Sequence, residues 1–301
     1  MPNSRDIKRR IASVKSTGQI TKAMKLVASS KVTKAKNKVT TNRFYFENLK
    51  EAVKNAMTAG KVESPFIKDE VDDNKNKKVL YIVLSSDKGL CGGFNINLFK
   101  EMGNHIAQFQ NHENYFAISG KKAREFCKRK GYEVVFEKDG ISENPLYEDA
   151  KEFGNFAIKK YLDKEYDEVY LVYTHFKSII SQEQKVFKLL PFSLEEDAGE
   201  YDEQEDMNVK GKIVKPLTLY EPSPEVVLDY VIPKYTDGVI YGAFLESAAS
   251  ELGSRMTAMD NATTNAEGLV DGLTLTYNRI RQASITTEIS EIVGGANALN
   301  A

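Results

Sequence analysis

The first sixty residues carry apolar side chains at a repeat of 3.5 residues, reached by alternating steps of four and three. Eleven of the fifteen positions reached from Ile7 are apolar, and no proline lies between Asn3 and Ser64. This repeat turns one stripe of an α-helix toward a partner helix and predicts a left-handed coiled coil. The stripe consists of Ile7, Ile11, Val14, Gly18, Thr21, Lys25, Ala28, Val32, Ala35, Val39, Asn42, Phe46, Leu49, Val53 and Ala56.

The same kind of stepping recurs at the other end of the chain. Eleven of the fourteen positions reached from Tyr241 are apolar, and no proline follows Pro233. We therefore expect a second long helix over about 224–292, with Pro233 as the place where it could kink. Its stripe consists of Tyr241, Leu245, Ala248, Leu252, Met256, Met259, Thr263, Ala266, Val270, Leu273, Tyr277, Ile280, Ser284 and Thr287.

The two helices must be antiparallel if they pair, because the first leads into the middle of the chain and the second leads out of it. At a rise of about 1.5 Å per residue they would be ~80 Å and ~100 Å long, so the second would project by about 20 Å. The projecting tip carries Ile285, Ile289, Ile292 and Val293. Exposed apolar residues there would need a cover from another molecule. The alternative is a helical hairpin packed on the protein's own core.

The middle of the chain alternates short apolar runs with helical patterns, which predicts a mostly parallel, Rossmann-like sheet. Strands are expected at 78–85, 115–119, 132–137 and 168–174, with an edge strand at 179–190, and helices at 95–110, 121–130 and 146–162. The predicted fold class is α/β, a long antiparallel coiled coil of the terminal helices plus a central Rossmann-like domain. The predicted domains are 1–60, 75–220 and 224–301.

Charge is unevenly distributed along the 301 residues, although the net charge is only −1. Residues 1–50 hold thirteen Lys or Arg against two acids, which gives +11, whereas 195–208 hold eight acids and no base. The two cysteines, Cys91 and Cys127, have no metal-type spacing, and this favours a reducing compartment. Without an apolar run of eighteen residues or a signal peptide, we expect a chain that neither spans a membrane nor is secreted.

The segment 85–95, SSDKGLCGGFN, follows a predicted strand and precedes a predicted helix, where a phosphate-binding loop would lie. It has neither the GxxxxGK[ST] nor the GxGxxG spacing. We interpret it as a tight turn whose glycines permit positive φ. The alternative is a nucleotide-dependent enzyme with helical appendages, which would bind ATP through this turn.

Other candidate chemistry is sparse. Cys91 lies near a helix start, but it has no histidine close in sequence to make it a nucleophile. His105, His112 and His175 form no metal spacing, and we place the first two on a helix surface or end. No catalytic, cofactor-binding or metal-binding residue is predicted. The basic first helix leaves nucleic-acid binding as a third hypothesis.

Three segments together resemble the γ subunit of F-type ATP synthase. They are RRIASVKSTGQITKAMKLVA at 9–28, the 85–95 turn, and a C-terminal segment with ESA at 246–248, SRMTAM at 254–259 and NRIRQASITTEI at 278–289. The resemblance implies a non-catalytic central-stalk rotor whose coiled coil turns inside a ring of three α and three β subunits. It also implies a foot that meets the ε subunit and the membrane c-ring, coupling proton flow to ATP synthesis without binding nucleotide.

The resemblance also implies roles for particular residues, each of which could instead be a structural helix residue. Residues implied to contact the β subunits are Lys22, Met24, Lys25, Arg255, Arg281, Gln282, Thr286 and Glu288. A hydrophobic sleeve would hold Ile289, Ile292 and Val293, and the foot would use Leu219, Tyr220 and Glu221.

The sequence departs from the pattern of chloroplast members of this family at one place, and this bears on regulation and origin. The acidic stretch 195–206 has no cysteine pair, so the thiol switch of chloroplast relatives should be absent. This favours a peripheral membrane protein on the cytoplasmic face of a bacterial plasma membrane, and leaves a mitochondrial origin open.

Overall fold

The computed structural model describes residues 4–58, 64–67, 76–109, 111–192, 220–221 and 223–299. The chain forms two compact units, one of Met1–Ser30 with Arg255–Ala301 and a larger one of Lys31–Ser254. The acidic stretch 195–206 and Leu219 lie outside the described residues. The three-part division at 1–60, 75–220 and 224–301 stays a prediction.

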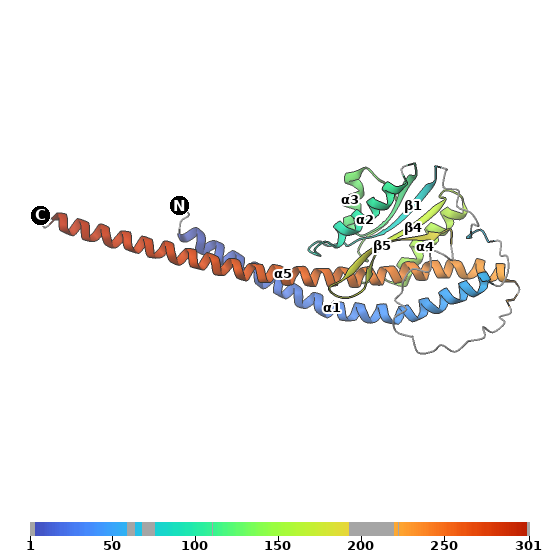
Figure 1. Cartoon of the computed structure of the whole chain (residues 1–301), viewed down its shortest axis with the longest axis horizontal. Helices are drawn as coiled ribbons and strands as arrows, with labels where there is room; N and C mark the ends of the chain where they lie inside the picture. Colours follow the sequence, from blue (N-terminus) through green and yellow to red (C-terminus); the bar gives the residue numbers. More distant parts are fainter. Residues whose placement is uncertain are drawn as a thin grey trace. The chain divides into compact units, whose positions relative to one another are not determined.

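The terminal helices are continuous and long (Figure 1). Helix α1 spans Ser4–Thr58, and helix α5 spans Pro224–Leu299 with Pro233 inside it. In the smaller unit the two helices are antiparallel, because Thr21 and Thr263 share a hydroxyl hydrogen bond of 2.8 Å while Lys25 meets Asp260. The predicted coiled coil is thus confirmed, and α5 continues seven residues past the expected end at 292.

Burial follows the two predicted stripes. Every stripe residue of α1 whose side chain is described is buried or half-buried, and so are all those of α5 from position 241 to 280. Ser284 and Thr287, the last two positions of the α5 stripe, are exposed. The strict alternation fails at one place, since Leu252 and Met256 both follow steps of four. Such a stutter locally unwinds a coiled coil.

A five-stranded sheet of order β3-β2-β1-β4-β5 lies in the larger unit. Its strands are β1 (Lys78–Leu84), β2 (Glu113–Ser119), β3 (Glu133–Lys138), β4 (Glu168–Phe176) and β5 (Gln182–Leu190). The first four are parallel and β5 is antiparallel to β4, which confirms a mostly parallel sheet with an edge strand. That strand starts at 182 rather than 179, because a turn closed by Ser178 N–H to the Ser181 carbonyl (2.9 Å) precedes it.

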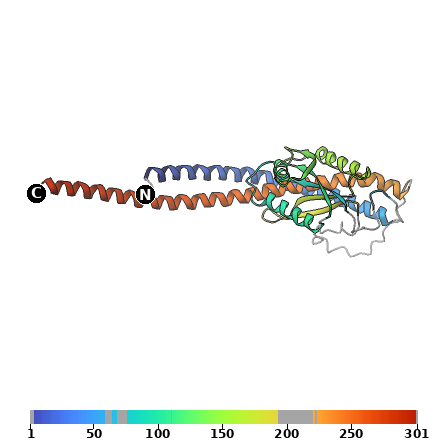
Figure 2. The same cartoon turned by 90° about the horizontal axis from the view of Figure 1, so that it is seen from above.

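Both faces of the sheet are covered by helices (Figures 1 and 2). Helices α2 (Phe94–Gln108) and α3 (Lys121–Lys130) cover one face, and α4 (Tyr147–Leu162) covers the other together with α5. Alternate residues of β1 supply the two cores, since strand side chains point to opposite faces in turn. Val79, Tyr81 and Val83 face α2 and α3, and Leu80, Ile82 and Leu84 face α4 and α5.

Candidate partner-binding surfaces

The basic segment of α1 places its three candidate residues differently. Lys22 is exposed, whereas Met24 and Lys25 are half-buried. Lys25 Nζ donates to Asp260 Oδ1 at 2.6 Å, but both side chains are substantially exposed, so this ion pair adds little stability. Lys22 is the exposed member of this set, so its ammonium group is accessible to a partner.

Arg255 does not share an exposed surface with Lys22. Its side chain is buried, with 6% of the residue exposed. Asp260 is the residue of α5 that lies opposite Lys25. Arg255 precedes Asp260 by five residues, which places it roughly 7 Å away along the axis of α5. Its predicted contact with a β subunit stays a prediction.

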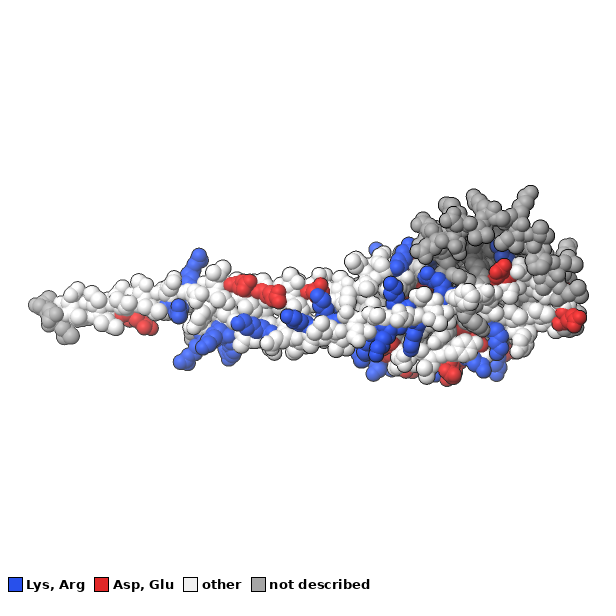
Figure 3. All heavy atoms as spheres, turned by 90° about the horizontal axis from the view of Figure 1, so that it is seen from below, with Lys and Arg blue, Asp and Glu red and all other residues white. Residues whose placement is uncertain are grey.

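A groove between α1 and α5 lies beside a close approach of the two helices. A Cβ added to Gly18 would lie 3.3 Å from the Ala266 Cβ, so these two small residues permit the approach. The rims differ in charge. The α1 rim has Val14, Lys15, Gln19 and Lys22, and the α5 rim has Thr263, Glu267, Val270 and Asp271. Figure 3 shows Lys and Arg side chains spread along the terminal helices, with acidic groups between them.

The C-terminal part of α5 beyond Ile280 has no partner helix among the described residues. The pairing of Thr21 with Thr263 and of Lys25 with Asp260 places the start of α1 beside about residue 280. Residues 281–299 therefore extend beyond it, which corresponds to about 28 Å at the helical rise. This exceeds the expected 20 Å because the helix continues past 292.

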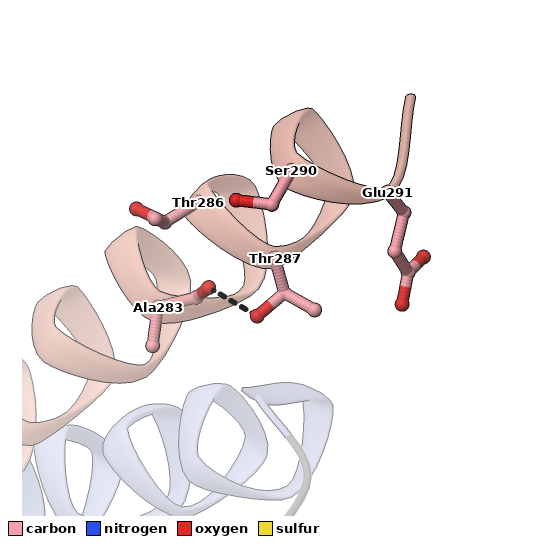
Figure 4. Close-up of a pocket in the computed structure, with 5 residues that line it drawn as sticks. All are labelled: Ala283, Thr286, Thr287, Ser290 and Glu291. Carbon is pink, nitrogen blue, oxygen red and sulfur yellow. Dashed lines mark hydrogen bonds between the residues drawn. The ribbon is translucent and has the colours of Figure 1, made fainter. Parts of the chain in front are cut away.

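The polar candidates of this tip are all exposed, namely Arg281, Gln282, Thr286 and Glu288. Thr286 and Thr287 donate their hydroxyls to carbonyls of their own helix, those of Gln282 and Ala283, at 3.0 Å each. Figure 4 shows the shallow hollow beside them, lined by Ala283, Thr286, Thr287, Ser290 and Glu291. Hydroxyls bonded to their own backbone leave Arg281 and Gln282 as the strong donors of the tip.

An apolar face continues the tip. Ile289, Ile292 and Val293 are 56%, 71% and 52% exposed, and Ile285 is 46% exposed. Positions 285, 289 and 292 follow the four-and-three spacing that places residues on one face of a helix. A contiguous exposed apolar face is typical of a protein-binding surface.

The foot candidates are described only in part. Tyr220 is half-buried and packs against the main core, and Glu221 is exposed. Tyr220 therefore contributes to the core while part of it stays exposed, and the predicted partner contacts of Tyr220 and Glu221 stay predictions.

In the 85–95 turn, the place where a phosphate could bind is occupied by the side chain of Asp87. The Asp87 carboxylate accepts hydrogen bonds from the backbone N–H groups of Lys121, Gly140 and Ser142, at 3.0 to 3.3 Å. Lys121 opens α3, so this carboxylate occupies the place where a helix N-terminus would bind a phosphate. Gly92 has a φ of 57°, as expected for the tight turn. Sequence reasoning missed Asp87, because its partners lie more than thirty residues away.

Cys91, His105 and His175 each contact other residues of the chain. Cys91 is 2% exposed and accepts a hydrogen bond from Asn95 Nδ2 at 3.3 Å. His105 lies at the end of α2 as expected, and it is half-buried. Its Nδ1 is 3.1 Å from the Tyr81 hydroxyl, and burial lowers its pKa. His175 contacts Glu246 at 2.6 Å. Among the described residues, no group of three His, Cys, Asp or Glu could hold a metal.

Comparison with known proteins agrees with this arrangement of paired terminal helices and an α/β unit. A family model described as ATP synthase matches residues 3–299. The chain is 44% identical to the sodium-ion-specific ATP synthase gamma chain of Acetobacterium woodii, covering 99% of both chains. It is 45% identical to the ATP synthase gamma chain of Alkaliphilus metalliredigens, covering 98% of both.

Two solved structures share the fold of this chain. A chain from the central stalk and c-ring of the Tetrahymena thermophila mitochondrial ATP synthase has a TM-score of 0.56 at 25% identity, covering 81% of this chain and 99% of that one. A chain of the Euglena gracilis mitochondrial enzyme has a TM-score of 0.65 at 18% identity, covering 98% and 94% respectively, and this shows the shared fold.

The fold and its bare tip define a coiled-coil subunit of a larger assembly. The chain belongs to the family of ATP synthase gamma chains. Among the helices that the structure describes, none combines the length and the apolar character that a membrane span requires.

Proposed function

We propose that this chain is the non-catalytic rotor of the central stalk of an ATP synthase and transmits torque between a membrane ring and the catalytic subunits. The observation that carries the proposal is the change in burial along α5. Its apolar stripe is covered by α1 up to Ile280, and beyond that residue the apolar side chains are bare. An exposed apolar face of this kind is typical of a protein-binding surface, and a ring of partner subunits would cover it.

The partners follow from the family. An α3β3 hexamer would enclose the paired helices, and the ε subunit and c-ring would meet the foot at Tyr220 and Glu221. The predicted coupling ion is the proton. The curated relative that is sodium-ion-specific supports keeping Na⁺ as an alternative. Identity above 40% to chains of Acetobacterium woodii and Alkaliphilus metalliredigens supports the cytoplasmic face of a bacterial plasma membrane.

The individual site residues divide into three groups by the contact each can make. Lys22 offers an exposed cation to acidic loops of the β subunits. Half-buried Met24 and Lys25 and buried Arg255 are the other proposed contacts of these loops. At the tip, the strong donors are Arg281 and Gln282, next to Thr286 and Glu288. The remaining group, Ile289, Ile292 and Val293, would enter the hydrophobic sleeve.

The rival hypothesis, a nucleotide-dependent enzyme, would need an open phosphate site at the 85–95 turn. Asp87 holds that position with its own carboxylate, and a second anion there would be repelled. The deciding measurement is ATP hydrolysis by the tagged chain, purified once alone and once gently from its own cells. An inert lone chain beside a hydrolysing preparation with α- and β-sized partners supports the rotor. Turnover by the lone chain without partners would support the enzyme.

A second measurement addresses the tip. Replacing both Arg281 and Gln282 with Ala should lower ATPase turnover of the assembled complex, because two exposed donors facing the catalytic ring are lost. The chain itself should fold normally, since both side chains are exposed. Arg279→Ala, also exposed on α5, is the matched control for loss of a positive charge. Equal turnover in the double variant and the wild type would remove the assigned role.

A further inference from the structure

We propose that a polar collar in the larger unit grips α1 and α5 and fixes the angle of both helices relative to the sheet. The collar comprises the loop at 139–146 and the β4–β5 region at 174–182, with their contacts on the two helices. It includes Lys31 and Ser254, the first and last residues of the larger unit. Its role in carrying torque rests on the proposed rotor function.

The part of the collar that contacts α1, which we call the α1 arm, consists of ion pairs and hydrogen bonds. Lys31 Nζ donates to Glu143 Oε2 at 2.5 Å, and Lys88 Nζ donates to Glu143 Oε1 at 3.0 Å. Lys38, two helical turns beyond Lys31, donates to Asn144 Oδ1 at 2.7 Å. The hydrogen bond from Lys31, with that from Lys88, lowers the pKa of Glu143 to about 2. The carboxylate is therefore ionised at every physiological pH and holds both lysines.

The loop that carries Glu143 is itself fixed to the sheet. Asp87, just after β1, accepts hydrogen bonds from the backbone of Gly140 and Ser142. Lys88 of the same turn also reaches Glu143. A displacement of α1 at Lys31 is therefore passed through a short series of bonds to the central strand of the sheet.

The part of the collar that contacts α5, the α5 arm, is a row of serines whose hydroxyls form hydrogen bonds with the sheet. Ser247 Oγ accepts from the Thr174 N–H at 3.2 Å, and Ser250 Oγ donates to the Thr174 carbonyl at 3.3 Å. One turn farther on, Ser254 Oγ donates to Gln182 Oε1 at 3.0 Å. Gln182 in turn donates to the Ile179 carbonyl at 2.7 Å. Thr174 and Ser250 are both fully buried.

A third contact joins the two arms. Glu246, buried on α5, lies 2.6 Å from His175 Nδ1 of β4 and 3.8 Å from Arg43 Nη2 of α1. One carboxylate therefore joins both terminal helices to the sheet. This contact belongs to the same helical face of α5 as Ser250, four residues farther along.

The chemistry of these contacts indicates positioning. The hydrophobic effect that buries the apolar side chains is itself non-directional, so it does not by itself fix an angle. Hydrogen bonds fix a distance and an angle, and their strength falls steeply when either changes. The collar thus resists rotation of α1 and α5 about their axes at the position where torque would enter them.

The test uses the assembled complex, with a bead attached to the α/β unit and the catalytic ring immobilised. Glu143→Gln removes the charge on which both lysines converge, and Ser250→Ala with Ser254→Ala removes two contacts of the α5 arm. The matched control is Lys34→Gln, an exposed lysine of the same helix. We expect both arm variants to keep the control's ATPase turnover while the bead shows wider angular fluctuation and ATP-driven ion uptake falls.

A rescue and an independent readout complete the test. Lys31→Cys with Glu143→Cys, bridged by a bifunctional maleimide, should restore the narrow fluctuation, and the native Cys91 and Cys127 are buried from the reagent. In the purified full chain, Glu143→Gln should speed hydrogen exchange of the 139–146 amides about tenfold, the factor for one charge-assisted hydrogen bond.

The outcomes separate the collar from the rotor function. Fluctuation and exchange equal to those of Lys34→Gln would overturn the collar, and so would loss of turnover when the bridge is closed. Faster exchange with unchanged fluctuation would also overturn its positioning role. A wild-type complex that lacks catalytic partners, or does not pump ions, would instead contradict the proposed rotor function, and the exchange result would still decide whether the collar grips α1.

Discussion

Asp237 lies on α5 where this helix packs against α4, and its charge should destabilise the folded chain at neutral pH. The residue is 3% exposed, and its Oδ1 accepts no hydrogen bond from the described part of the chain. A Cβ on Gly154 of α4 would collide with that oxygen, so the carboxylate fills the space left by the glycine. Burial raises the pKa of Asp237 to about 6, although Lys234 and Lys151 act in the opposite direction.

The size of the effect follows from this pKa. In the unfolded chain Asp237 loses its proton near pH 3.8, whereas the folded chain holds it until about pH 6. The stability linked to this proton is fully present below 3.8 and is lost as the pH rises through 6. Roughly two pKa units correspond to about 3 kcal/mol. Asp237→Asn keeps the shape without the charge, and an amide that must find a partner reduces the net gain to about 1–2 kcal/mol.

Urea unfolding of the purified chain between pH 4 and 8, followed by far-UV circular dichroism, measures the effect. The difference in unfolding free energy between Asp237→Asn and wild type should grow from pH 4 to pH 6 and remain constant above that. Asp271→Asn is the control, because Asp271 is an exposed acid on the same helix. A difference that does not change with pH, or a variant less stable than wild type at pH 7.5, would refute the reasoning.

Three further predictions concern packing and burial. Gly18→Val should destabilise the helix pair by about 1–3 kcal/mol through overpacking against Ala266. A Cβ at Gly268 would meet open space, so Gly268→Ala should stabilise the same pair by about 0.5–1 kcal/mol. Thermal unfolding of the two variants measures the difference. Gly120→Ala should cost about 1–3 kcal/mol in urea unfolding, because Gly120 has a φ of 90° and a Cβ would strike the Ser85 carbonyl. Cys127, whose pKa burial raises to about 11, should react with a thiol reagent at pH 8 far more slowly in the folded chain than in urea.

Local periodicity explains how much of this fold could be predicted from the sequence. The stepping from Ile7 found the buried face of α1, since a helix repeats its environment every few residues and the pattern records that repeat. The alternating runs likewise predicted the parallel strands. The unpaired tip followed from comparing two helix lengths. Only its extent was underestimated, because α5 continues through Gly294 and Gly295, although glycine commonly ends a helix.

The parts that could not be predicted depend on contacts between distant residues. Asp87 bonds to Gly140 and Ser142 more than fifty residues later, and nothing in the spacing of the 85–95 turn signals this. His105 has the sequence surroundings of a surface residue, yet its ring lies 4.6 Å from that of Tyr170 across the layer. Such contacts are decided by which elements become neighbours, and a single sequence does not show this directly.

The bare apolar face at the end of α5 has a consequence for how the chain must be produced in a cell. A copy released from the ribosome without its surroundings presents Ile285, Ile289, Ile292 and Val293 to water, and two such copies can bury these faces against each other. The solubility of this chain therefore depends on a cell making the subunits that enclose it in matching amounts. Cells that make this chain in excess of the subunits that enclose it should accumulate aggregates rather than spare rotors.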